Sequence, residues 1–320
     1  MCMEWWCNIV IRTRHDDHSK CGMVSFEDGF AGRRRRMKRL INATRVLTIA
    51  TVAMTPDLNP QISRDRMKRI VEETKRDHPD VRLILFGETI LGWFYKDGET
   101  QAYHDSIAEP VPGPSSAFFA ELAKAHDVAI SFGLSEKADG RLYNTQLVIS
   151  PEGEMIAKHR KFWIRNKVFS PGDRKLTTVT LDGVKVAVLI CADARSFELM
   201  RAIRRERVDV VLASLADYGT SLRLNQLMGA FYDAWTVIAN RYGEEDERVW
   251  HGLISITDPW ARMKVRGMGK EQILVQPLLI SNPTGVGRWL RRILVGFRFI
   301  GLASMLTVQM VWKAVTKKRG

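Results

Sequence analysis

The feature that most constrains the fold is an alternation of short apolar runs with amphipathic stretches along residues 46–280. The runs are rich in β-branched residues, which is typical of buried strands, and the amphipathic stretches have helical periodicity. Strands are predicted at 46–54, 81–87, 128–134, 143–150, 153–160, 184–190, 208–213, 235–239, 253–258 and 272–278, and helices at 62–78, 116–126, 196–206 and 221–233. This order predicts an α/β fold with a mixed sheet.

Residues 46–54 have two interpretations. They follow a basic segment and are about as long as the hydrophobic region of a signal peptide. Their β-branched content, their late position and the stop at Thr55-Pro56 instead favour a buried strand, which we prefer. Further along, the turn chemistry around Gly153 predicts a hairpin of 143–150 with 153–160. The segments 253–258 and 272–278 are predicted to pair as the last strands.

The positive charge of the chain is confined to its two ends. The formal net charge is +13, yet residues 46–280 contain 31 basic and 31 acidic side chains. A balanced segment of this size can form one large core, and its neutrality argues against a nucleic-acid-binding body. We therefore predict three parts: a basic, disordered extension at 1–45, one large domain at 46–280, and a basic amphipathic helix at 281–320.

The cysteines indicate an intracellular, cytoplasmic protein. Three of the four lie before residue 22, and the body keeps only Cys191, which cannot form an internal disulfide there. Residues 1–45 could also be partly an over-long reading frame that truly starts at Met23 or Met37. The Cys and His residues of this extension have a spacing that fits no common zinc finger, so we expect no metal and no cofactor.

Three side chains at strand or loop ends are candidates for chemistry. Glu88 follows a strand directly, where α/β sheets place their clefts, although such acids often cap a helix or face solvent. Lys161 ends a basic cluster that, alone, is typical of a solvated loop. Cys191 follows the most apolar strand and begins a strand-to-helix turn, where backbone N–H groups can lower a thiol pKa. Inert packing explains a lone cysteine equally well.

Taken together, these residues resemble the carbon–nitrogen hydrolase family, the nitrilase superfamily, whose triad is Glu, Lys and Cys in this chain order. The resemblance covers nearly the whole neutral body. The matching segments are 85–89, 143–145, 151–154, 158–161, 169–173, 188–193, 197–199, 238–241, 250–252 and 258–259. It implies a four-layer α-β-β-α sandwich that forms a homodimer or a larger homo-oligomer.

The resemblance also implies roles for the three residues. Cys191 would attack the carbon of an amide or nitrile, and Glu88 would take the thiol proton and later activate water. Lys161 and the backbone N–H of Ala192 would stabilise the oxyanion. The alternatives are an N-acyltransferase that uses the same thioester and a non-catalytic binding or scaffold relative.

One departure from the family pattern leaves the substrate open. Many relatives carry a second glutamate a few residues after the lysine, where this chain has Arg165 or Asn166. The Cys-Ala-Asp sequence resembles amidases and carbamoylases more than nitrile hydrolysers, which implies an amide or carbamoyl substrate. Candidate pocket residues are Trp93, Phe94 and Tyr218, although core packing would explain them about as well.

The C-terminal residues 288–320 form a separate pattern. On a helical wheel, the basic side chains from Arg288 to Lys313 gather on one side of an otherwise apolar helix. This pattern predicts an interfacial membrane anchor, to which the cluster at 317–319 adds attraction for anionic lipid. An oligomerisation helix is the second interpretation. A true membrane span is the third, since residues 293–312 just reach the necessary length.

Overall fold

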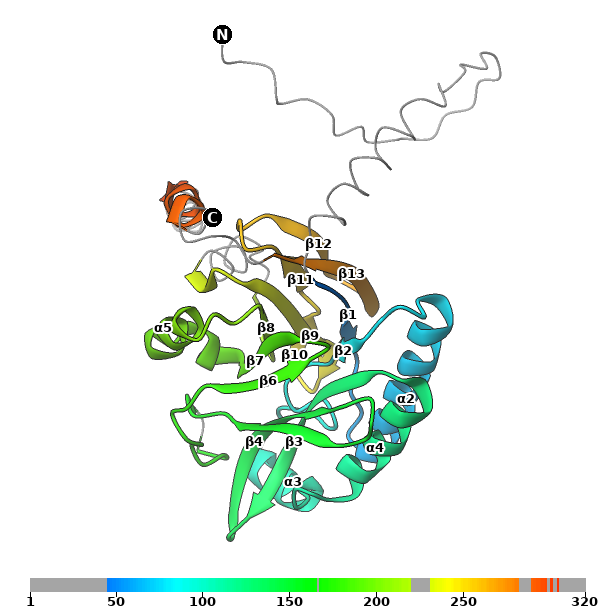
Figure 1. The fold of residues 1–320 in the computed structure, drawn as a ribbon. Coiled ribbons are helices and arrows are strands. Elements are labelled where there is room, and N and C mark those ends of the chain that lie inside the picture. Colours follow the sequence, from blue (N-terminus) through cyan, green and yellow to red (C-terminus); the bar gives the residue numbers. More distant parts are fainter. Residues whose placement is uncertain are drawn as a thin grey trace, which may run out of the picture. The chain divides into compact units, whose positions relative to one another are not determined.

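The computed structural model describes residues 45–165, 167–219, 231–281, 289–297, 300, 301 and 304. The strands are β1 Arg45–Met54, β2 Leu83–Leu85, β3 Ala129–Ala138, β4 Arg141–Ile149, β5 Met155–Arg160, β6 Thr177–Leu181, β7 Val184–Ile190, β8 Val210–Ser214, β9 Trp235–Glu245, β10 Arg248–His251, β11 Ile254–Thr257, β12 Met263–Gly267 and β13 Gln272–Ile280. The helices are α2 Pro60–Asp77, α3 Thr100–Ile107, α4 Pro114–His126 and α5 Phe197–Arg205, with a 3₁₀ helix, η1, at Cys191–Arg195. Figure 1 shows their arrangement.

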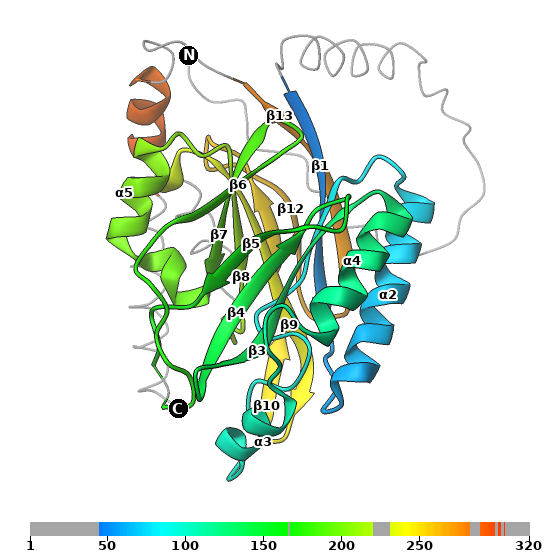
Figure 2. The same ribbon diagram turned by 60° about the horizontal axis from the view of Figure 1, so that its bottom comes forward.

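The strands and helices form four layers. One sheet has the order β5-β4-β3-β2-β1 with β13 beside β1, and the second contains β6 to β9 with β11 and β12. The sheets join where β1 pairs with β9 at Ala53–Asn240 and Met54–Arg241. Helices α2 and α4 lie side by side on the outer face of the first sheet, and α5 covers the second (Figures 1 and 2). The predicted α-β-β-α sandwich is therefore confirmed.

The alternation of side chains along each strand explains why the runs are apolar throughout. In β1, Leu47 and Ile49 point between the two sheets, whereas Ala50 and Val52 point toward α2 and α4. In the second sheet, β8 likewise divides its side chains between the inter-sheet core and the α5 interface. Each fully buried aliphatic side chain contributes about 1.5–3 kcal/mol, so both faces stabilise the strands.

Most predicted strands and helices are present, and the interpretation of residues 46–54 as a buried strand is confirmed by β1. The predicted pairing of 253–258 with 272–278 is wrong. Instead, β11 forms a hairpin with β12, and β13 runs antiparallel to β1. Four short elements, α3, β6, β10 and β12, were not predicted. Residues 1–44 of the extension predicted at 1–45, and most of the predicted helix 221–233, lie outside the described residues.

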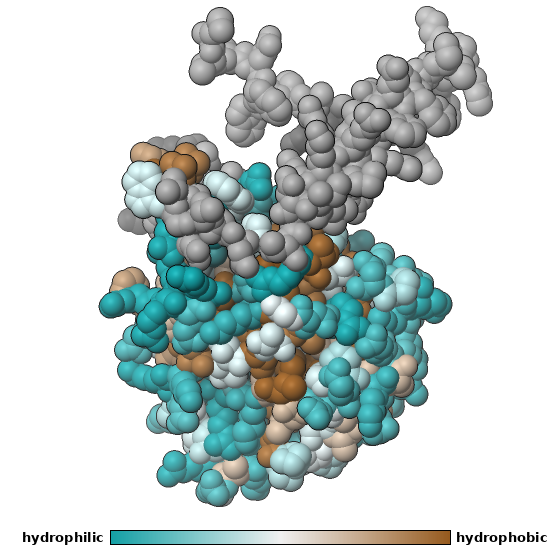
Figure 3. All heavy atoms as spheres, in the orientation of Figure 1, coloured by the Kyte–Doolittle hydropathy of each residue, from teal (hydrophilic) through white to brown (hydrophobic). Residues whose placement is uncertain are grey.

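The C-terminal segment is helical at residues 289–297. Arg291 and Arg292 both contact Asp233, at 2.7 and 3.2 Å, so two cations of the predicted basic stripe are paired with the body. Trp289, Leu294 and other apolar side chains of this helix are exposed. Figure 3 shows hydrophobic residues on this part of the helix. Among the described residues, no helix has both the length and the apolar character needed to cross a bilayer.

Candidate active site

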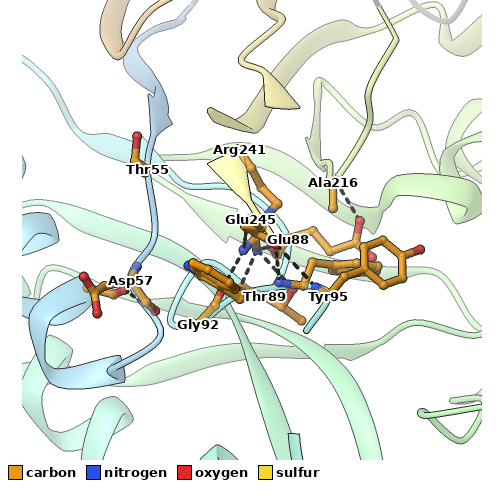
Figure 4. Close-up of polar contacts among 12 residues, drawn as sticks. Thr55, Asp57, Glu88, Thr89, Gly92, Tyr95, Ala216, Arg241 and Glu245 are labelled. Atoms are coloured by element: carbon orange, nitrogen blue, oxygen red, sulfur yellow. Dashed lines mark hydrogen bonds and ion pairs between the residues drawn. The ribbon is translucent and has the colours of Figure 1, made fainter. Parts of the chain in front are cut away.

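The site lies where strands of both sheets end, and its centre is the carboxylate of Glu88. Glu88 follows β2 and has no exposed surface. Its Oε1 accepts hydrogen bonds from Lys161 Nζ at 2.5 Å and Asn144 Nδ2 at 2.7 Å. Its Oε2 accepts one from the backbone N–H of Ala216 at 2.9 Å, which Figure 4 shows. Donors from three segments therefore fix both oxygens of this carboxylate.

Cys191 begins η1 directly after β7, with a backbone φ of +44°, a conformation that non-glycine residues rarely adopt. Burial and, to a smaller extent, the negative charge of Glu88 together raise the pKa of its thiol to about 12, although the positive charge of Lys161 opposes them. The thiol is therefore neutral at rest. It can act as a nucleophile only if a nearby base accepts its proton during attack.

Lys161 lies directly after β5 and is almost completely buried. Burial lowers its pKa, but the negative charge of Glu88, whose carboxylate lies 2.5 Å away, outweighs this effect and raises the pKa well above its ordinary value. Lys161 is therefore an ammonium held in a low-dielectric site, where it can stabilise a developing oxyanion. The negative charge of Asp193 also raises the pKa of Lys161, so two carboxylates act on this ammonium. The second glutamate of many relatives is missing here, and Arg165, near its place in the sequence, is exposed.

Asp193 connects the Cys191 turn to the segment that carries Lys161. This fully buried carboxylate accepts from the backbone N–H of Trp163 at 2.9 Å and contacts His159 Nε2 at 3.1 Å. His159 Nδ1 in turn contacts Thr177 Oγ1 at 3.0 Å. The Asp of the Cys-Ala-Asp sequence thus has a positioning role. Ala192, the predicted oxyanion donor, is the half-buried second residue of this turn.

The loop after Glu88 is held by a buried ion pair between Arg241 and Glu245 of β9. Arg241 Nη1 donates to the carbonyl oxygens of Glu88 and Thr89 at 2.9 and 3.0 Å, and its Nη2 donates to that of Gly92 at 2.6 Å. Glu245 Oε2 accepts from the backbone N–H of Phe94 at 2.7 Å. Figure 4 shows Arg241 reaching from β9 to this loop. Arg241 is therefore a positioning residue.

Replacing Arg241 with glutamine is expected to destabilise the protein by about 3–5 kcal/mol, because Glu245 loses its buried partner. Arg241→Lys keeps the charge but not the planar fork of donors. We expect it to lower kcat more than it raises KM, since the loop after Glu88 loses its anchor while the fold persists. Thermal unfolding and steady-state kinetics measure the two effects. Arg76→Gln, which removes an exposed ion pair, should change neither.

Aromatic side chains lie on and beside the loop that follows Glu88. The Phe94 ring centre lies 6.0 Å from Lys161 Nζ. Tyr95 packs edge-on against Phe94, with ring centres 4.7 Å apart, and burial raises the pKa of its hydroxyl. Tyr218 is 40% exposed and stacks on Trp250 at 4.3 Å. Of the predicted pocket residues, Phe94 thus lies near Lys161, and Tyr218 packs against Trp250.

For the third predicted pocket residue, Trp93, the structure gives only a backbone contact, from its N–H to the hydroxyl of Tyr103 at 3.0 Å. Sequence reasoning did not select Asn144, Tyr95, Trp250, Arg241 or Glu245. Asn144, Arg241 and Trp250 do lie within segments that matched the family pattern, and that match was the signal that could have found them. Tyr95 and Glu245 carry no such signal.

His104 is a buried histidine that contacts Phe94 and should make the stability of the folded protein depend on pH. His104 contacts Ser135 Oγ at 2.8 Å and the carbonyl oxygen of Phe94 at 3.1 Å, and burial lowers its pKa to about 4. The unfolded chain takes up this proton near pH 6.5, before the folded chain does. The free energy of unfolding should therefore fall by about 3 kcal/mol as the pH drops from about 6.5 to about 4.

Urea titrations across this window measure that slope. In His104→Asn the slope should become shallower, even if the variant is less stable at neutral pH. The exposed His78→Asn provides the matched control and should retain the slope of the parent protein. An unchanged slope in His104→Asn would assign the pH dependence to other groups.

Comparison with known proteins places this geometry in a family. Residues 48–277 match the family model for carbon-nitrogen hydrolase. The chain belongs to the carbon–nitrogen hydrolase family. Among curated carbon–nitrogen hydrolases, it is 32% identical over 192 residues to an (R)-stereoselective amidase of Pseudomonas sp., a match that spans 58% of this chain and 68% of the amidase. It is 30% identical over 193 residues to a formamidase of Bacillus cereus, spanning 58% of this chain but only 56% of the formamidase.

Solved structures of carbon–nitrogen hydrolases share the fold. Saccharomyces cerevisiae Nit3, described as a member of branch 10 of the nitrilase superfamily, superimposes with a TM-score of 0.68 at 19% identity, covering 78% of this chain and 94% of Nit3. An amidase from Nesterenkonia sp. AN1, with an acetamide moiety on its active-site cysteine, superimposes with a TM-score of 0.64 at 17% identity, covering 74% and 91%. This protein is an amidase-like member of the carbon–nitrogen hydrolase family.

Proposed function

We propose that this protein hydrolyses a small amide through a thioester on Cys191, with Glu88 as the general base and acid and Lys161 as the oxyanion donor. The observation that carries the proposal is the buried contact of 2.5 Å between Glu88 and Lys161, whose charges both act on the Cys191 thiol. Relatives named amidase and formamidase support an amide substrate over a nitrile.

The first half of the reaction forms the thioester. Glu88 takes the thiol proton while the sulfur attacks the carbonyl carbon, and the negative charge moves to the carbonyl oxygen. The Lys161 ammonium and the Ala192 N–H stabilise this oxyanion. When the tetrahedral intermediate collapses, the C–N bond breaks, and protonated Glu88 gives its proton to the departing amine. The products of this half are ammonia or an amine and the acylated Cys191.

The second half restores the enzyme. Glu88, again a carboxylate, takes a proton from a water molecule that attacks the thioester carbon. Lys161 and Ala192 stabilise the second oxyanion in the same way. Collapse breaks the C–S bond, and Glu88 returns its proton to the sulfur, so the acid is released and the thiol is regenerated. Each proton transfer uses the same carboxylate, which its three hydrogen bonds hold in one orientation.

The decisive experiment is ammonia release from a panel of short amides, carbamoyl compounds and nitriles, each with and without added hydroxylamine. We expect ammonia from amides without an acceptor, because water resolves the thioester. If product forms only when an amine acceptor is added, the protein is an N-acyltransferase instead. If no substrate of the panel acylates Cys191, as judged by intact mass, the non-catalytic alternative is correct.

We also propose that the C-terminal segment 288–320, which the sequence predicts to be helical, binds an anionic membrane surface. Its exposed apolar side chains include Trp289, Leu294 and Phe297, and the sequence adds cations at 288, 298, 313 and 317–319. The test is flotation with vesicles that contain phosphatidylserine. Trp289→Ser/Phe297→Ser should abolish binding. If the parent protein does not float but forms a homo-oligomer that this variant breaks, a second copy covers the helix instead.

A further inference from the structure

A basic pocket lies at the edge of the sandwich, where the edge strands β5 and β6 of the two sheets come together. Its volume is about 680 Å³, within the range of pockets that bind small molecules. Four cationic side chains line it: Arg141, Lys158, Arg160 and Lys175. The only carboxylate among its lining residues is Asp173. None of Glu88, Lys161 and Cys191 lines it, so this pocket is separate from the proposed active site.

The charges of the pocket are only partly neutralised. Lys158 and Arg160 both contact the buried carboxylate of Glu136, at 3.0 and 2.6 Å. For Arg141 and Lys175, the described residues provide no ion pair within 4.0 Å, and both side chains are exposed. Four cations thus face two carboxylates, Glu136 and Asp173, and the charge of Asp139 also acts on Arg160, so the pocket keeps a net positive charge. A concave surface with a net positive charge attracts anions.

The pocket is held in place by the protein itself. The turn that carries Asp173 is fixed by backbone hydrogen bonds from Ser170 N–H to Leu142 O at 2.7 Å and from Gly172 N–H to Lys161 O at 2.9 Å. A Cβ atom at Gly172 would lie 2.4 Å from the carbonyl oxygen of Arg160, so only glycine allows this approach. Because the turn is already ordered, little conformational entropy is lost on binding.

The cationic side chains on β5 are ordered as well. The Arg160 guanidinium lies 3.9 Å from the centre of the Tyr143 ring and donates to Glu136 through Nε at 2.8 Å. Burial opposes ionisation of Glu136, but hydrogen bonds from Arg160, Thr145 and Lys158 outweigh it and lower the pKa of Glu136. Glu136 therefore remains charged and orients both cations. Arg141 and Lys175 stay available for a ligand.

We propose that this pocket binds a small oxyanion that carries two or more negative charges, of the phosphate or carboxylate class. None of the proposed catalytic residues lines the pocket, so its ligand is not held at the site of the proposed hydrolysis. The pocket is a separate binding site on the same domain, and occupancy does not require Cys191.

The test is isothermal titration calorimetry of the full chain at low ionic strength, with inorganic phosphate in one arm and succinate in the other. Arg141→Ala/Lys175→Ala is expected to weaken binding of the preferred anion at least tenfold. The matched control is Arg266→Ala/Lys270→Ala, which removes the same two charge types from exposed positions without an ion pair among the described residues. This control should bind as the parent protein does.

The two arms identify the ligand class, since tighter binding of phosphate assigns the pocket to phosphorylated compounds and tighter binding of succinate to dicarboxylates. Three results would overturn the proposal: no heat of binding for either anion, equal binding by the pocket variant and the parent, or equal weakening in both double variants. Cys191→Ala should bind the anion unchanged. The proposal can thus stand even if the proposed amide hydrolysis fails, and the reverse is also true.

Discussion

Cys191→Ala is expected to abolish amide hydrolysis, with a decrease in kcat of at least about 10⁴-fold, because no other group in the site can form the thioester. The fold should persist, because Cys191 packs at the edge of the core under α5. Its replacement by alanine removes a single sulfur atom and leaves little empty space. Ammonia release and intact mass after incubation with substrate measure the loss, and thermal unfolding checks the fold.

Cys191→Ser sharpens this test. A serine hydroxyl is similar in size, but it is a weaker nucleophile and is harder to deprotonate in a buried site where the thiol pKa is already raised to about 12. We therefore expect no turnover from this variant either. If either variant retains more than about one per cent of the parent kcat at equal folded fraction, the thioester mechanism is wrong.

Glu88→Gln is expected to lower kcat by about 10²–10⁴-fold, the range for loss of a general base. Glutamine preserves the shape and can still contact Asn144, but it cannot accept the thiol proton. The Lys161 ammonium also loses the carboxylate at 2.5 Å that balances its charge, so stability should fall as well. Stopped-flow measurement of ammonia release separates the first half of the reaction from the second.

Glu136→Gln is the matched control for Glu88→Gln. Glu136 is equally buried and also binds cations, but it does not contact the proposed catalytic groups. Its substitution should lower the unfolding temperature while kcat stays within a few fold of the parent value. If both variants lose kcat to the same extent, the effect of Glu88→Gln reports a loss of structure, and Glu88 is not the base.

Much of the fold could be predicted because its strands are buried on both faces. The run in β1 has no polar face, so its assignment did not depend on finding a partner. The short strands β10 and β12 lie at the periphery and have mixed exposure, so their sequences resemble loops. The partner of β13 was predicted wrongly because pairing with β1 joins segments that are far apart in the chain, and sequence proximity favoured β11.

The residues of the candidate site also differ in whether the sequence could predict them. Glu88, Lys161 and Cys191 could be selected because the family resemblance marks them, and the structure brings Lys161 into contact with Glu88. The backbone N–H of Ala216 and the side chain of Glu245 could not be selected. Their contributions depend on geometry across distant segments. Every residue type except proline supplies a backbone N–H, and a glutamate is equally common in exposed loops.

The seam between the two sheets has a consequence for how the enzyme loses activity. Two ladder pairs join β1 to β9 there, and one of them contains Arg241, which also anchors the loop after Glu88. The halves of the sandwich cannot separate without releasing that loop. Heat inactivation and the loss of the inter-sheet core should therefore occur in one transition. The remaining catalytic activity then measures the fraction of molecules in which the two sheets are still joined.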